Sequence, residues 1–386
     1  MRLDTTLGPL RRQKVVVVGT AVVLLTTWLI FHWQRRPDPK TWTEGENEIR
    51  QRSPDPWTWT EDENEMPRLM SRLKSAGKLT DVAEFAVDLG ARQGHGPTEM
   101  LFKPPYNYAG LMVEGNPKWR EELNKVVPSP KVKKVIGYIT PSGVVKIFQD
   151  NGVPNNLAFL KVDIDGDDCA TLAMILNAGY RPRVVQAEVT IEIPVPYAFG
   201  VLPLPSYDQG VAVGFHSCSV AMMTAIVETY GYRLVGVGGT KDALFVHKSS
   251  IGGSGGVTEA YADASFFAFA DCCLAEPNPS MAVYLEKNPA EFGFTVPSGL
   301  PRPSQWMQLA DPRPGKAQHT TESSQLAASI KHYMHAACRS AASKWSKEHP
   351  PSDPEACAFE YVMGQDAKTA AAEFLAKVLG SPEPST

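Results

Sequence analysis

Short apolar runs alternate with segments of helical spacing between Asp81 and Lys248. The runs have the length and the β-branched and aromatic content of strands, and helix-start signals fall between them. This alternation predicts βαβ units around a largely parallel sheet. We expect strands at 84–89, 110–114, 134–139, 158–164, 183–188, 232–237 and 243–247, and helices at 117–126, 141–151, 167–178 and 217–230.

The last two predicted strands are separated only by the five residues 238–242. A parallel crossover needs a dozen or more residues, so these strands should pair as an antiparallel hairpin. The expected fold class is therefore α/β, with a Rossmann-like, mostly parallel sheet that an antiparallel hairpin closes.

A continuous apolar segment precedes this region. Residues 15–33 carry no charged side chain and approach the ~20 residues that a membrane-spanning helix needs. No small-x-small cleavage site follows, so we predict an uncleaved, single-pass anchor behind a tail of residues 1–14. Four basic residues precede the span and four follow it within 34–50, so charge sets no orientation. We expect the body on the lumenal side of an endomembrane.

The segment after the predicted span contains a near-duplicate, Pro37–Ile49 and Pro54–Met66, rich in proline and acid. Two such copies cannot bury a continuous core, so we assign 34–70 to a stalk. A docking role for its three tryptophans is the alternative. The α/β domain is assigned to 71–250, and a helical, Pro-rich extension to 251–386, with helices near 323–347 and 356–379.

Composition narrows the classes of partner. The net charge of −4, with no compensating block of Lys and Arg, gives no general attraction to nucleic acid. The six cysteines lack the paired spacing of a zinc site, and we expect them to be buried free thiols.

Glycines and acids follow the first two predicted strands. Asp88 precedes a loop with glycine at positions 90, 94 and 96, which lets the backbone approach a ligand closely. The order of the glycine spacings is wrong for the dinucleotide fingerprint. Glu114 ends the next strand, where a carboxylate typically accepts hydrogen bonds from ribose hydroxyls. The pattern indicates a nucleotide-like ligand.

A second group of acids follows a buried strand at the carboxyl edge of the predicted sheet. Asp163 and Asp165 lie at the end of this strand and His216 titrates near neutral pH, so these three side chains are candidates for proton transfer. Alternatively, hard oxygen ligands from Asp163, Asp165, Asp168 and Glu188 could hold a divalent cation such as Mg²⁺. Two purely structural roles also stay open: helix capping by Asp167 or Asp168, and packing of His216.

Together these motifs resemble class I S-adenosylmethionine (SAM)-dependent methyltransferases, whose first motif is an acid followed by a relaxed G-x-G-x-G. The Asp-Ile-Asp-Gly element at 163–166 and its surroundings are more closely similar to FkbM-type methyltransferases, over about 84–248. Asn is usual in that pattern where Asp167, Thr190 and Asp242 stand here. Asn-to-Asp changes replace a donor with an acceptor, which affects expected substrate contacts more than cofactor contacts.

The resemblance implies a SAM-methyltransferase sheet with SAM as the cofactor. Its methionine end would lie near Asp88, Gly90, Ala91, Gly94 and Gly96, its ribose on Glu114, and Asp163 nearby. The resemblance further implies that Asp163, Asp165 and His216 align the methyl acceptor and remove its proton. The predicted function is membrane-anchored O-methylation of a small-molecule, glycan or lipid-linked acceptor. The alternative is a catalytically inactive methyltransferase fold that serves as a binding module at a membrane.

Overall fold

The computed structural model describes residues 65–190, 193, 196–203, 217–237, 242–250, 300–302, 325–330, 332–333 and 361–380. The predicted tail, membrane span and most of the stalk lie outside these residues. Within the described residues, no helix is both long and apolar enough to cross a bilayer.

The strands are β1 Ala83–Leu89, β2 Ala109–Glu114, β3 Val132–Ile136, β4 Leu157–Val162, β5 Val184–Glu188, β6 Ala198–Val201, β7 Tyr232–Val237, β8 Asp242–His247 and β9 Tyr361–Gly364. The α-helices are α3 Glu65–Ser75, α4 Arg120–Val126, α5 Pro141–Asn151, α6 Asp168–Asn177, α7 Val220–Thr229 and α12 Ala367–Gly380. Short 3₁₀ helices are η2 Pro97–Phe102, η3 Pro117–Trp119 and η4 Lys248–Ser250.

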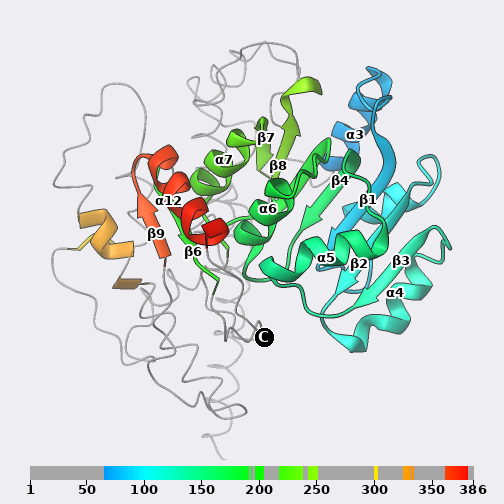
Figure 1. The fold of residues 1–386 in the computed structure, drawn as a ribbon, viewed down its shortest axis with the longest axis horizontal. Helices are drawn as coiled ribbons and strands as arrows, with labels where there is room; N and C mark the ends of the chain where they lie inside the picture. Colours follow the sequence, from blue (N-terminus) through cyan, green and yellow to red (C-terminus); the bar gives the residue numbers. More distant parts are fainter. Residues whose placement is uncertain are drawn as a thin grey trace, which may run out of the picture. The chain divides into compact units, whose positions relative to one another are not determined.

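Seven strands form one sheet in the order β3-β2-β1-β4-β5-β8-β7 (Figure 1). The first five pair in parallel, whereas β8 pairs antiparallel with both β5 and β7. The predicted α/β class, the mostly parallel Rossmann-like sheet and the closing hairpin are therefore confirmed. Because parallel strands end at the same edge, the ends of β1, β2, β4 and β5 meet there.

Two apolar layers cover the two faces of this sheet. Val87 and Leu89 of β1 pack with α5, α6 and α7, whereas Ala86 packs with α3, η2 and α4. Strand residues alternate between faces, so Asp88 shares the face of Ala86. The register places Lys161 of β4 opposite Asp88 and Gln186 of β5 opposite Lys161, so a polar row runs across these three strands on that face.

Local signals explain where individual helices begin. The side-chain oxygen of Thr140 accepts a hydrogen bond from the Gly143 N–H, and Pro141 occupies the first turn of α5. Gly152, with φ of +67°, ends the helix in the left-handed region. The predicted bounds 141–151 match the observed helix.

Three expectations about elements need correction. The predicted strand 134–139 is β3 Val132–Ile136, because the Gly137 N–H donates to the Glu114 carbonyl and the chain then leaves the sheet. Helix α3 starts at Glu65, with Met66 and Met70 buried, so the folded body begins inside the predicted stalk. The predicted helix 356–379 is a strand, β9, followed by α12.

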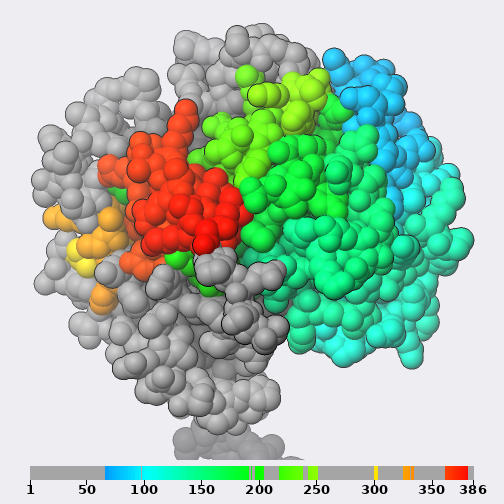
Figure 2. Space-filling view, in the orientation of Figure 1, coloured from blue at the N-terminus to red at the C-terminus, as the bar shows by residue number. Residues whose placement is uncertain are grey.

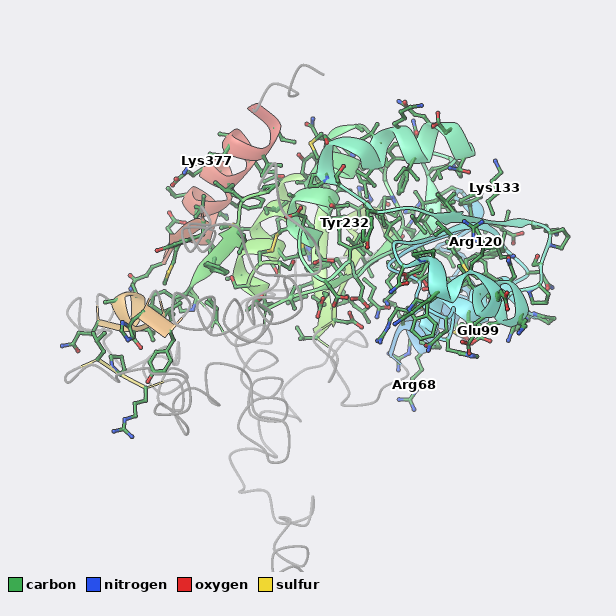
Figure 3. All side chains as sticks on the ribbon, turned by 90° about the horizontal axis from the view of Figure 1, so that it is seen from below. Arg68, Glu99, Arg120, Lys133, Tyr232 and Lys377 are labelled. Atoms are coloured by element: carbon green, nitrogen blue, oxygen red, sulfur yellow. A yellow bond between two sulfur atoms is a disulfide. The ribbon has the colours of Figure 1, made fainter. Side chains whose placement is uncertain are left out.

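The carboxyl-terminal segment belongs to the same core as the sheet. Strand β9 pairs antiparallel with β6, and α12 packs on α7 and α6. Figure 2 shows the red carboxyl-terminal segment against the green segment of the chain. Phe374 of α12 is fully buried and lies against Gly200 of β6, where an added Cβ would come within 2.9 Å of its ring. Figure 3 shows Lys377 on this helix and Tyr232 on β7. The Tyr232 hydroxyl donates to the Pro182 carbonyl at 2.7 Å, which fixes β7 to the start of β5.

A disulfide joins Cys169 at the start of α6 to Cys218 just before α7. Both residues are buried. The expectation of free thiols is therefore wrong for these two cysteines, since the fold brings distant positions to a Cα–Cα distance of 5.9 Å, within the usual disulfide range. The other four cysteines lie outside the described residues.

Candidate functional site

The glycine loop after β1 packs directly on the end of β4. Gly90 has φ of +87°, and a Cβ added there would lie 1.6 Å from the carbonyl oxygen of Asp163. A side chain at this position is excluded by both backbone conformation and space. Gly94 also has positive φ, +85°, and its added Cβ would approach Leu123 at 2.9 Å. Around Gly96, by contrast, an added Cβ would meet nothing within 4 Å.

Glu114 holds this loop at the end of β2. Its two carboxylate oxygens accept hydrogen bonds from the backbone N–H groups of Arg92 and Asn116, at 2.7 and 2.6 Å. The N–H groups of Gly90 and Ala91 both donate to the Val113 carbonyl. A carboxylate offers about four lone-pair positions, so Glu114 retains acceptor capacity for hydroxyl groups of a ligand. The structure thus brings Gly90, Ala91 and Glu114 together at one edge.

Asp88 is a buried carboxyl group beneath that loop. Its side chain is 3% exposed, and its Oδ1 has no hydrogen-bond partner in the described part of the chain. Burial raises the pKa of Asp88, and the nearby Lys161 ammonium and the Thr98 side chain oppose that rise. A buried acceptor without a donor is unusual in a folded protein, and it points to a donor that a ligand or a water would supply.

Lys161 is the main residue that the sequence analysis did not identify. It is the cross-strand partner of both Asp88 and Gln186, and its ammonium lies 2.7 Å from Asp163 Oδ2. Only 11% of its side chain is exposed. Burial alone would lower the pKa of Lys161, but the carboxylates of Asp88, Asp163 and Asp242 together raise it. A lysine within a buried strand was the available signal, since Lys is almost never buried unless paired.

Asp165 and Asp168 shape the turn after β4 in different ways. Asp165 is exposed and adopts φ of +56°, in the left-handed region. Asp168 is fully buried, and its two oxygens accept from the Ile164 and Gly166 N–H groups at 2.8 and 3.1 Å. Burial raises the pKa of Asp168 to about 7, against these hydrogen bonds. Its carboxylate therefore organises the turn that presents Asp163 and Asp165.

Three of the four acids predicted as metal ligands come together. Carboxylate oxygens of Asp163, Asp165 and Glu188 lie within 4.8 Å of one another, whereas Asp168 is not in this group. A divalent cation could be held by these three oxygens. However, one oxygen of Asp163 already faces the Lys161 ammonium.

Gln186 and Asp242 extend the polar row along the same face. Gln186 Nε2 donates to Asp242 Oδ2 at 2.7 Å, and Asp242 is the cross-strand partner of Glu188. Gln186 is 5% exposed, and its Oε1 has no hydrogen-bond partner within the described ranges. Burial raises the pKa of Asp242 to about 6, although Lys161 lowers it.

His216, predicted as a proton acceptor, lies outside the described residues. Hydrogen bonds hold the segment that follows it against the chain just after β5. The Ser217 hydroxyl donates to the Glu188 carbonyl at 3.3 Å, and the Thr190 N–H donates to the Cys218 carbonyl at 2.8 Å. The disulfide from Cys218 to Cys169 ties this segment to the start of α6, one residue after Asp168.

No family model matches the sequence, and comparison with curated proteins finds no match. Solved structures with similar folds include the methyltransferase domain of bacterial CtHen1-C, at 14% identity and a TM-score of 0.31 over 49% of this chain and 99% of that one. The N-terminal domain of EvdMO1 with SAH bound matches at 12% identity and a TM-score of 0.28, over 54% and 97% of the two chains. M. jannaschii TYW2 in complex with AdoMet matches at 12% identity and a TM-score of 0.24, over 49% and 78%. Such values carry no activity over to this chain.

Proposed function

We propose that the chain is a SAM-dependent methyltransferase that acts on an oxygen of its acceptor. The observation that carries the proposal is the arrangement at the ends of β1 and β2. There Gly90 packs on the Asp163 backbone, Glu114 holds the glycine loop, and Asp88 keeps an oxygen without a donor. This arrangement offers acceptors for an ammonium and for hydroxyl groups, and it offers open space at Gly96.

The residues fit the cofactor in two respects. Asp88 Oδ1 could accept from the α-ammonium of SAM, and the remaining acceptor positions of Glu114 could accept from its ribose hydroxyls. Bound SAM would supply a methyl carbon attached to a positively charged sulfur, which is attacked in line.

The chain's own part in the reaction would be to position and deprotonate the acceptor. Asp163 and Asp165 lie at the end of β4, next to the glycine loop, with Asp165 exposed to the solvent. The Lys161 ammonium fixes Asp163 and stabilises its charge, whereas no such partner is shown for Asp165 among the ion pairs of the described residues. We assign proton acceptance to Asp165 and electrostatic positioning to Asp163.

Calorimetric titration of the full-length protein with SAM tests the cofactor site. Glu114→Gln should weaken SAM binding about tenfold or more, because charge-assisted hydrogen bonds to ribose and backbone are lost. Glu121→Gln, on exposed α4, removes the same charge away from the site and should bind as the wild type does. Equal binding by both variants would remove Glu114 from the proposed site.

Location is a second part of the proposal. Residues 15–33 would anchor the chain, with the body in an oxidising endomembrane compartment. The Cys169–Cys218 disulfide supports this assignment, because disulfides persist in oxidising compartments and are rare in the cytosol.

Thiol alkylation of protein from intact cells, followed by peptide mass analysis, tests the location. The proposal predicts that Cys169 and Cys218 remain unmodified until a reductant is added to the denatured chain. Alkylation of both residues in denatured protein without reductant would contradict it.

A further inference from the structure

The side of the sheet formed by its edge strand β3 carries an excess of positive charge. Residues 116–138 hold six basic and two acidic side chains, whereas the whole chain has a net charge of −4. Helix α4 packs on β3, and Figure 3 shows Arg120 and Lys133 on the side of the body away from Lys377. Five of the six basic side chains are exposed, and we call them the basic flank: Lys118, Arg120, Lys125, Lys131 and Lys133.

The charge of the basic flank is not neutralised by acids of the described residues. The ion pairs of those residues involve other cations, and Glu121 and Glu122 of α4 take part in none of them. The Lys118 ammonium lies 4.6 Å from the centroid of the Trp119 ring, and Lys133 Nζ donates to the Asn151 carbonyl at 2.9 Å. Neither of these partners carries a charge, so an anionic partner would remove repulsion within the flank.

Lysine on an edge strand has a general role, because it discourages pairing with the strands of other molecules. That role accounts for Lys133, which belongs to β3. It does not account for Lys118 of η3 or for Arg120 and Lys125 of α4. The positive charge therefore extends over more of the surface than protection of the strand edge requires.

Two aromatic side chains adjoin the basic flank. Tyr138 is 68% exposed and is the one large hydrophobic side chain that is exposed among the described residues. Its ring lies against Gly115, where an added Cβ would come within 2.9 Å of it, and Trp119 is half-buried next to Lys118. Tyr and Trp favour membrane–water interfaces, since their rings are apolar and their polar ends can reach water. Exposed cations beside such rings are typical of surfaces that contact lipid headgroups.

The proposed anchor would keep this surface close to a bilayer. Residues 34–64 separate the predicted span from α3, and these 31 residues reach at most about 110 Å when fully extended. Such a tether raises the effective concentration of the lipid surface, so that contacts of low individual affinity suffice. A soluble polyanion has no such advantage.

We infer that the basic flank docks on anionic lipid headgroups of the leaflet on the body's own side of the membrane, with Tyr138 at the interface. Each cation near an anionic surface adds to the attraction, which falls off within a Debye length. The inference goes beyond methyl transfer and does not depend on it. It rests on the proposed anchor for the tether alone.

Lysine acetylation of the full-length protein in vesicles tests this contact. The protein is reconstituted in phosphatidylcholine, alone or with phosphatidylserine at about 30%, and treated with a membrane-impermeant reagent. We expect Lys118, Lys131 and Lys133 to react at least about threefold more slowly on the anionic vesicles, and the difference to disappear at about 1 M salt. Lys368, exposed on α12, should react equally on both kinds of vesicle.

A charge reversal within the flank provides the matched comparison. Lys125→Glu combined with Lys131→Glu should abolish the slower reaction of Lys118 and Lys133 on anionic vesicles. Both substituted side chains are exposed and form no ion pair in the described part of the chain, so the fold should be kept. The control is Lys248→Glu combined with Lys368→Glu, which makes the same charge change on exposed positions outside the flank and should keep the slower reaction.

Equal reaction of the flank lysines on the two kinds of vesicle would overturn the inference, as would a slower reaction that the flank variant retains. Slower reaction with added heparin, and none on anionic vesicles, would replace the lipid with an anionic polysaccharide. Failure of the anchor is separate: a protein that sediments with anionic vesicles through this flank, but not with neutral ones, keeps the docking surface and loses the proposed span.

Discussion

Glycine at position 90 connects the sequence motif to the geometry of the site most directly. Its positive φ and its contact with the Asp163 carbonyl mean that the loop and the end of β4 are fitted to each other. Because Glu114 binds the same loop, the candidate cofactor residues and the candidate acceptor residues share one backbone framework. A change at Gly90 would therefore disturb both.

The Gly90→Ala variant should lose at least about 3 kcal/mol of unfolding free energy, because its Cβ cannot be accommodated without a backbone shift. Gly96→Ala is the matched control in the same loop, where the backbone is extended and nothing lies within 4 Å of the added Cβ. It should unfold within about 0.5 kcal/mol of the wild type. Urea denaturation measures the unfolding free energy of both variants. Equal midpoints would contradict the close packing of Gly90 on the Asp163 carbonyl.

Lys161 holds together several carboxylates that could not otherwise stay charged in their buried positions. Lys161→Met should cost about 3 kcal/mol or more at pH 7, since Asp88, Asp163 and Asp242 then lack their shared cation. Lys161 lowers the pKa values of Asp88 and Asp242, so without the ammonium these two values rise further in the folded protein. A group with a raised folded pKa favours folding at low pH and loses that contribution as pH rises through the folded pKa.

The cost of Lys161→Met should therefore be smaller at pH 5 than at pH 7. Chemical denaturation at both pH values measures it. Lys161→Arg, which keeps the charge, is the control and should lose less at pH 7. A loss of equal size at the two pH values would show that packing of the lysine stem, and not charge pairing, is what the lysine contributes.

At the scale of elements, the carboxyl-terminal helix α12 completes the hydrophobic core, although it lies far from the strands of the main sheet in the sequence. Phe374→Ala should cost about 3–5 kcal/mol, because a fully buried ring against α7 and Gly200 leaves a cavity. Ala372→Ser, on the exposed face of the same helix, should change stability by less than about 0.5 kcal/mol. Thermal unfolding compares the two, and a small effect of Phe374→Ala would mean that α12 is not part of the cooperative unit.

The elements that the sequence predicted well are those whose signals are local. Helix α5 has its own cap at Thr140 and its own stop at Gly152, and the hairpin of β7 and β8 follows from a short connection. Strands β6 and β9 were not predicted, since four-residue strands are defined by pairing with each other across more than 150 positions. Helix α3 was missed because its apolar residues are embedded in a charged, repeat-like segment.

The site residues also divide into those with local signals in the sequence and those that depend on distant contacts. Strand-end acids and loop glycines are visible as residue types next to apolar runs, and the structure brings Asp163, Asp165 and Glu188 together. The fourth expected ligand, Asp168, instead binds the backbone of its own turn, a contact that depends on the left-handed Asp165. The pairing of Gln186 and the disulfide depend on register and on distant contacts, which composition and spacing do not encode.

At the scale of the molecule, one sheet edge carries two sets of groups with different proposed tasks. The ends of β1 and β2 present Asp88 and Glu114 for the cofactor, and the end of β4 presents Asp163 and Asp165 for the acceptor. Lys161 lies between the two sets, since Asp88 is its cross-strand partner and Asp163 its ion pair. The disulfide joins the start of α6 to the residues before α7, and α12 packs on both helices. These contacts stabilise the part of the fold that carries the proposed acceptor residues.

Titration of the full-length protein with SAM, and separately with NAD⁺, tests whether the chain binds the cofactor of a methyltransferase. We expect saturable binding of one SAM per chain, weakened at least about tenfold by Asp88→Asn, and no binding of NAD⁺. Absence of SAM binding by a folded protein, or preference for NAD⁺, would contradict the methyltransferase assignment. The glycine loop would then belong to a fold with another nucleotide or with none.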